Sequence, residues 1–171
     1  MANSWLLQTG YAPGIVGPAA ALRFFTLAGG LDSAAQSTEA NEQIQVNESL
    51  TARKLGARCS AYVDRDVTIT FRTNAAPGAQ TITVNATGYF EDAGNSDALV
   101  DGDDICGGWI RTAGGGTSPT ITLIQVQMDH ASAGSPPFIT AIAAGAAHPG
   151  DATGYSPFGP MDSLTLANAR S

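Results

Sequence analysis

Carboxylates are the residues in this chain with the clearest capacity for chemistry. Residues 91–104 read EDAGNSDALVDGDD and hold six of the fifteen acidic side chains. Such a cluster could bind calcium, supply a pair of catalytic acids, or form polar turns between strands. The three alternatives demand different spacings, so the sequence can be used to choose among them.

A calcium-binding EF-hand loop fits this stretch poorly. Such a loop needs oxygen ligands at positions 1, 3, 5 and 12, and a glycine at position 6. If the loop starts at Asp97, then Asp101 and Gly102 occupy positions 5 and 6. Leu99 and Gly108 then stand at the ligand positions 3 and 12. We therefore predict no metal site here; any calcium binding would be irregular and of low affinity.

Turn chemistry explains more of the same residues. Asp101-Gly102 is a strong tight-turn dipeptide, because glycine tolerates a positive φ and aspartate bonds the backbone ahead of it. Gly94-Asn95-Ser96 is typical of a second turn. A strand would then end at residues 98–100, and the next would begin at residues 105–106. This interpretation places the carboxylates in solvated loops at one end of a β-structure.

No other group of residues has a catalytic spacing. A glycosidase acid pair needs a cleft of sugar-binding aromatics, and the chain has only two Trp. His130 and His148 have no partner at a zinc-ligand spacing, and Cys59 and Cys106 do not form a CxxC pair. The run Gly114–Gly116 lacks the Lys-Ser/Thr of a P-loop and is typical of a hairpin loop. We predict no enzyme activity, no catalytic residue, no metal and no cofactor.

The charge pattern bears on partners and compartment. Only 13% of residues are charged, about half the usual quarter, and the net charge is −7. An acidic chain repels phosphate, so we predict no direct binding of nucleic acid. No apolar run is long enough to span a membrane, and the start MANSWLLQTG has no signal-peptide pattern. Without such a signal, Cys59 and Cys106 are expected as buried free thiols, although a disulfide stays possible.

Strands are the elements that must position all of these residues. Short runs of alternating polar and apolar residues, rich in Thr, Val and Ile, are bounded by Gly, Pro and Asn, as in the turn at 74–78. Their regular spacing predicts an all-β fold, an antiparallel jelly-roll-like β-sandwich with extended N- and C-terminal arms. The predicted strands include residues 42–46, 55–63, 67–71, 81–84, 105–111, 121–128 and 138–142.

The two ends differ from the middle and divide the chain. We expect an N-terminal arm at 1–30, the β-sandwich domain at 31–145, and a C-terminal arm at 146–171. Both ends combine Gly and Pro with large apolar side chains, which purely solvated tails rarely carry. The predicted interface residues are Trp5, Leu6, Phe24, Phe25, Tyr155 and Phe158.

Four stretches between residues 36 and 130 carry a resemblance to a known family. They read TEANEQIQV (38–46), VTITFRTN (67–74), ATGYFED (86–92) and VDGDDI (100–105), and a glycine loop at 112–117 follows. Their order and spacing resemble those of jelly-roll virion-surface proteins of tailed bacteriophages and prophages. The chain departs from that pattern in its long ends and in Asp101, where a small residue is usual.

This resemblance implies a structural role, with no catalytic residues. The expected function is that of a capsid decoration (cement) protein that binds and stabilises the lattice of the major capsid protein. The implied partners are a homo-oligomer, most often a trimer, and the major capsid protein. The implied location is the capsid surface of a virion assembled in the host cytoplasm. Two alternatives stay open: a tail, neck or fibre-associated module, and a carbohydrate-binding β-sandwich with an exposed aromatic platform.

Overall fold

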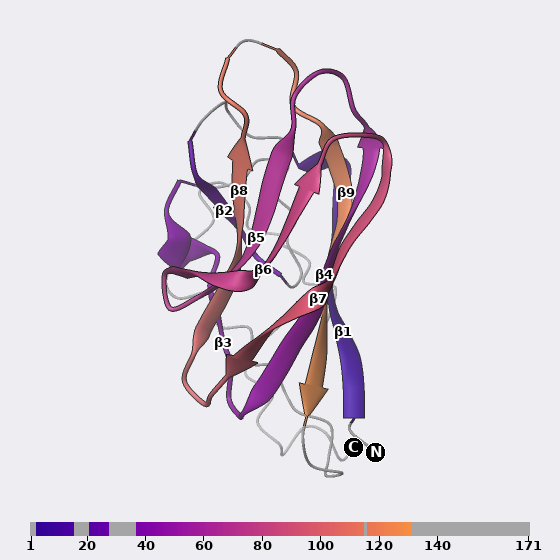
Figure 1. The fold of residues 1–171 in the computed structure, drawn as a ribbon. Coiled ribbons are helices and arrows are strands. Elements are labelled where there is room, and N and C mark those ends of the chain that lie inside the picture. Colours follow the sequence, from indigo (N-terminus) through magenta and orange to yellow (C-terminus); the bar gives the residue numbers. More distant parts are fainter. Residues whose placement is uncertain (1–2, 16–20, 28–36, 115, 131–171) are drawn as a thin grey trace, which may run out of the picture.

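A computed structural model of the chain describes residues 3–15, 21–27, 37–114 and 116–130. These residues form two antiparallel sheets packed face to face, together with one turn of 3-10 helix, η1 (Glu39–Asn41) (Figure 1). The predicted all-β antiparallel sandwich is confirmed. The strands are β1 (Asn3–Ile15), β2 (Arg23–Phe25), β3 (Ile44–Gln45), β4 (Leu50–Ala61), β5 (Val67–Thr73), β6 (Ala76–Val84), β7 (Gly88–Leu99), β8 (Asp104–Arg111) and β9 (Thr120–His130).

The strand order is that of a jelly roll. The first sheet has the order β1-β9-β4-β7, and the second has the order β2-β8-β5-β6, with β3 also paired to β8. Both β2 and β3 pair with β8, along successive parts of its length, so together they fill one strand position. In each sheet a strand from early in the chain lies beside one from late in the chain, β1 beside β9 and β2 beside β8, as in two interleaved Greek keys.

One hydrophobic core fills the space between the two sheets. On β5 the buried Val67, Ile69 and Phe71 alternate with half-buried threonines, and β9 buries Val126 and Met128 in the same way. This alternation arises because successive side chains of a strand point to opposite faces. The largest side chain in the core is that of Trp109, on β8.

The described part of residues 1–30 belongs to the sheets rather than to a separate arm. β1 pairs with β9 and makes it an internal strand, while β2 pairs with β8. Along β1, Leu7 and Thr9 are buried, whereas Leu6 and Gln8 are exposed, which is the alternation of a strand with one face on the core. The predicted C-terminal arm at 146–171 and the predicted strand at 138–142 lie outside the described residues.

The β5–β6 connection is tighter than the predicted turn at 74–78. Asn74 and Ala75 both have positive φ, at 50° and 63°, as a two-residue type I′ hairpin turn requires. Pro77 and Gly78 already belong to β6. The Asn74 side chain accepts a hydrogen bond from the backbone N–H of Asp104 at 2.9 Å, which fixes this turn against the start of β8.

The acidic stretch contains one of the two predicted turns. Gly102, with φ of 92°, turns the chain from β7 to β8, and the N–H of Asp103 donates to the carbonyl of Val100 at 3.1 Å. The prediction of a turn at 94–96 is wrong, because β7 continues through these residues. In the pairing of β4 with β7, Arg53 is opposite Ser96 and Leu55 is opposite Asp92, so the single residue Lys54 faces residues 93–95, which form a β-bulge.

Candidate functional site

Two carboxylates of the acidic stretch, those of Asp92 and Asp97, bind backbone N–H groups of the opposite sheet. Asp97 of β7 accepts hydrogen bonds from the N–H of Ala79 at 2.6 Å and of Gln80 at 3.3 Å. Asp92 accepts one from the N–H of Thr81 at 2.9 Å. All three donors lie on β6, which ends the strand order of the second sheet. Asp92 and Asp97 thus join β6 to β7 across the edge of the sandwich. The sequence had led us to expect these carboxylates in solvated loops.

A buried glutamine continues this network into the sandwich. The side chain of Gln80 is fully buried; its Oε1 accepts from the N–H of Leu55 at 2.9 Å, and its Nε2 donates to Asp97 at 3.0 Å. Leu55 follows Lys54, where the register of β4 shifts. Gln80 therefore satisfies a backbone group that lies at an irregularity of the ladder.

Hydrogen bonds also set the ionisation of Asp92. Partial burial on its own would raise the pKa of this carboxyl group, but the opposing hydrogen bonds prevail. The side chain of Asn95 and the N–H groups of Thr81, Asn95 and Gly94 all donate to it, and together they hold the pKa below its usual value. Asp92 is thus ionised, and its carboxylate stabilises the β7 bulge through these hydrogen bonds.

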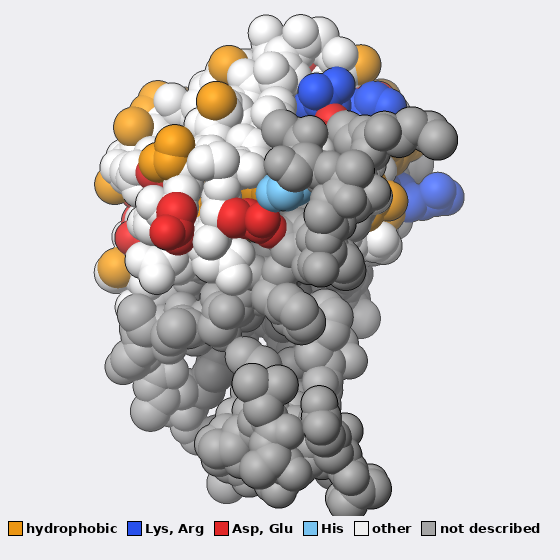
Figure 2. Space-filling view, turned by 90° about the horizontal axis from the view of Figure 1, so that it is seen from below, with side chains coloured by type: hydrophobic (Ala, Val, Ile, Leu, Met, Phe, Trp, Pro, Cys, Tyr) orange, Lys and Arg blue, Asp and Glu red, His pale blue; other side chains and the backbone are white. Residues whose placement is uncertain are grey.

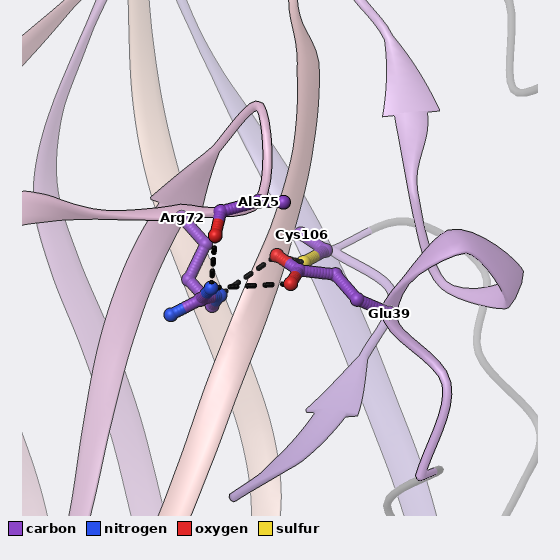
Figure 3. A network of polar contacts seen from close by, with 4 residues as sticks. All are labelled: Glu39, Arg72, Ala75 and Cys106. Atoms are coloured by element: carbon purple, nitrogen blue, oxygen red, sulfur yellow. Dashed lines mark hydrogen bonds and ion pairs between the residues drawn. The ribbon is translucent and has the colours of Figure 1, made fainter.

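A second polar cluster lies on the outer face of the second sheet (Figure 3). Arg72 of β5 binds Glu39 of η1 through two hydrogen bonds, Nε to Oε1 at 2.7 Å and Nη2 to Oε2 at 3.1 Å. The guanidinium also donates to the carbonyl of Ala75 at 2.6 Å, and its Cζ lies 5.3 Å from the centre of the Phe24 ring. This bidentate pair fastens η1 to the sheet.

The thiol in this cluster is poorly suited to redox or nucleophilic chemistry. Cys106 is buried, and its Sγ donates to Oε1 of Glu39 at 3.4 Å. Burial first, and then the negative charge of Glu39, raise the pKa of this thiol far above its usual value. Burial likewise raises the pKa of Cys59. Both cysteines are free and buried, as the sequence led us to expect, and both are protonated at neutral pH.

Three of the six predicted interface residues have described side chains, and these three differ in exposure. Leu6 is 53% exposed and points outward from β1, so it remains available to a partner. Phe25 is only 2% exposed within the core, and Phe24 is buried against Arg72, so both chiefly stabilise the chain's own sheets. The side chains of the remaining three lie outside the described part of the chain: Trp5, Tyr155 and Phe158.

The lower end of the sandwich carries acidic side chains beside a histidine (Figure 2). Nε2 of His130, at the end of β9, lies 2.8 Å from Oε2 of Glu48. Among the described residues, no three His, Cys, Asp or Glu side chains gather closely enough to hold a metal ion. His148 lies outside those residues. Nor does the described part of the chain contain a helix long and apolar enough to cross a membrane.

The outer face of the first sheet holds an aromatic side chain that the sequence interpretation did not single out. Tyr89 of β7 donates from its hydroxyl to Glu91 at 2.9 Å and accepts from Nε2 of Gln125, on β9, at 2.8 Å. Between these two strands lies β4. A Cβ placed on Gly56 of β4 would lie 2.9 Å from Cζ of Tyr89, so the tyrosine rests against bare backbone there.

The Tyr89 hydroxyl is held in its protonated form. Burial is the main cause, and the hydrogen bond to Glu91 and the charge of that carboxylate add to it, which raises the pKa of Tyr89 to about 12.

We use the name Tyr89 face for this surface, which consists of Gln8, Arg58, Tyr89, Glu91 and Gln125. The sequence does indicate that Tyr89 and Glu91 share one face of a strand, because they flank Phe90. It does not reveal the hydrogen-bond partner of Tyr89 on β9, because that contact depends on the register of the strands.

Comparison with known proteins adds no relative to this description. No protein-family model, no curated protein and no solved structure matches the chain.

Proposed function

We propose that this protein is a structural virion protein of a tailed bacteriophage, a capsid decoration protein that binds and stabilises the lattice of the major capsid protein. The observation that carries the proposal is the jelly-roll strand order of the two sheets. It is the fold that the motif resemblance implied, and β3 to β9 lie within residues 36–130, the part of the chain that carries the resemblance. Because a fold alone does not fix a function, the test must measure binding.

The positions of the motifs within the fold support the proposal. Residues 38–46 contain η1 and β3, and residues 67–74 are β5 with the first residue of its turn. Residues 86–92 lead into β7 and form its first five residues, and residues 100–105 make the turn into β8. Each stretch that resembles the family is therefore an element that shapes the sandwich.

The surface also suits a protein that docks on a shell. Few charged groups need to be desolvated on docking, because only 13% of residues are charged. Apolar side chains supply contacts worth about 25 cal/mol per Å² buried, without any need for a cleft. The exposed large apolar side chains of the described strands and loops are Leu6, Leu22, Val63, Tyr89, Val100 and Ile110.

The deciding experiment is co-sedimentation of the purified protein with expanded shells of the major capsid protein encoded in the same genome. We expect saturable binding, with a homo-trimer in solution by light scattering, and bound shells that withstand higher temperature than bare ones. Unexpanded shells are the matched control. A monomer without affinity for expanded shells would overturn the proposal. Binding to purified tails or necks instead would support a tail, neck or fibre-associated module.

A further inference from the structure

The Tyr89 ring lies along the sheet rather than standing out from it. In the register of β4 and β7, Tyr89 is opposite Arg58, and Glu91 is opposite Gly56. The hydroxyl of Tyr89 nevertheless reaches Gln125, which is opposite Gly56 on the other side of β4. The side chain therefore crosses β4 diagonally above Gly56, where the absence of a Cβ gives it room.

This position leaves one face of the ring open to solvent. Tyr89 is 46% exposed, as expected for a ring with one side against a sheet and the other uncovered. Its orientation is fixed in advance, because the hydroxyl binds Glu91 on its own strand and Gln125 two strands away. A ligand that stacks on the open face would meet a surface that needs little further ordering.

The polar groups around the ring match a ligand that has hydroxyl groups on its rim. Arg58 and Gln8 are exposed, and Glu91 and Gln125 border the ring directly. Amide, guanidinium and carboxylate groups together offer both donors and acceptors. Sugars combine hydroxyl groups, which both donate and accept, with an apolar ring face that can cover an aromatic ring.

Charge favours a neutral ligand over a phosphate or a strongly charged peptide. Arg58 and Glu91 carry opposite charges on this face. The neighbouring Arg53 pairs with Asp129 at 2.7 Å. A stacked nucleobase would want a positive groove for its backbone, and the chain carries a net charge of −7.

We propose that the Tyr89 face binds a neutral carbohydrate, with a pyranose ring stacked on the open side of Tyr89. The face is flat, so it suits an internal sugar of a chain better than a chain end. One stacked ring predicts weak binding by a single copy, with Kd on the order of 0.1–1 mM. Several copies in an oligomer would bind a polysaccharide more tightly. This proposal is independent of the proposed function as a capsid decoration protein.

A simpler role for Tyr89 is to cover the exposed backbone at Gly56, as aromatic side chains do for glycines in sheets. Tyr89→Leu separates the two roles, since leucine keeps an apolar cover and removes the ring. Tyr89→Phe keeps the ring and removes the hydroxyl. Ile110→Ala truncates an exposed apolar side chain on β8, in the other sheet, and is the matched control.

The test is an NMR titration of the ¹⁵N-labelled full-length protein with soluble oligosaccharides of glucose, galactose, mannose and N-acetylglucosamine, and with hyaluronan as an anionic probe. We expect at least one neutral oligosaccharide to shift amide signals around Tyr89. Tyr89→Leu should weaken that binding by roughly tenfold, whereas Tyr89→Phe and Ile110→Ala should change it by less than roughly threefold. Urea unfolding of each variant checks that it is folded.

Three results would overturn the proposal. The first is that neither the neutral oligosaccharides nor hyaluronan binds. The second is that folded Tyr89→Leu binds them as well as the parent protein does, which would leave only the covering role over Gly56. The third is that hyaluronan alone binds, which would assign the surface to anionic ligands.

Discussion

The pair of Arg72 and Glu39 allows a quantitative prediction of stability. Both side chains are largely buried, at 9% and 14% exposure, and two hydrogen bonds join them. Removing one partner of a buried pair typically costs about 3–5 kcal/mol, because the other charge is left without compensation. Glu39→Gln and Arg72→Met each remove one partner with little change in side-chain volume.

The surroundings of Arg72 adjust that magnitude. In Glu39→Gln, the guanidinium keeps its bond to the carbonyl of Ala75 and its position over Phe24, so we expect a loss of about 2–3 kcal/mol. Arg72→Met also loses both of those contacts, and we expect about 3 kcal/mol. The double variant leaves no buried charge unpaired, so its loss should be no larger than that of Arg72→Met alone. The predicted coupling energy is therefore at least about 2 kcal/mol.

Equilibrium urea unfolding at pH 7 measures all four proteins. Fluorescence is a suitable probe, because Trp109 is fully buried and becomes exposed on unfolding. The free energies of unfolding follow by linear extrapolation. If the two single losses add to within about 0.5 kcal/mol in the double variant, Glu39 and Arg72 are not coupled, and the ion pair does not fasten η1 to the sheet.

Asp92, Gln80 and the two cysteines each allow a further prediction. Because the folded pKa of Asp92 is lowered, its contribution to stability is present above the unfolded value of about 3.9 and is lost as the pH falls through the folded pKa. Asp92→Asn should therefore lower the free energy of unfolding at pH 7. Between pH 5 and 2 the variant should lose less of that free energy than the parent protein does, as measured by urea titrations. An identical pH dependence of the two proteins would contradict this. Gln80→Leu should cost about 1–3 kcal/mol in urea unfolding, because it leaves the N–H of Leu55 buried without an acceptor. Cys59 and Cys106 should react with Ellman's reagent only after unfolding; fast reaction of the native protein would contradict their burial.

The sequence predicted the sheet architecture because alternation is a local signal. Residues 67–71 and 121–128 alternate clearly, and they form the centres of β5 and β9. β1 was missed because Pro13 and the nearby glycines suggest a loop, although Leu7 and Thr9 already alternate with Leu6 and Gln8. What makes β1 a strand is its partner β9, more than a hundred residues away in the sequence.

The difference between local patterns and long-range strand pairing also explains why the sequence did not predict the bulge in the acidic stretch or the Tyr89 face. Gly94 and Asn95 are typical of a turn and also of a bulge, and only the register opposite Lys54 decides between the two. The alternation of Tyr89 and Glu91 around Phe90 is a local strand pattern. That Tyr89 would lie over Gly56 and reach Gln125 depends on a pairing of three strands that no local pattern specifies.

The acids of β7 also bear on how this protein can associate with others. An open strand edge can pair with another chain, and natural sheets often block such edges with charge. Asp92 and Asp97 occupy the N–H groups of β6 from Ala79 to Thr81, so a strand from a partner would have to displace two carboxylates to pair there. The bulge opposite Lys54 distorts the neighbouring strand β7 in addition. Contacts along this β6–β7 edge are therefore disfavoured, whereas the described part of the chain exposes apolar side chains elsewhere, such as Leu6 on β1 and Ile110 on β8.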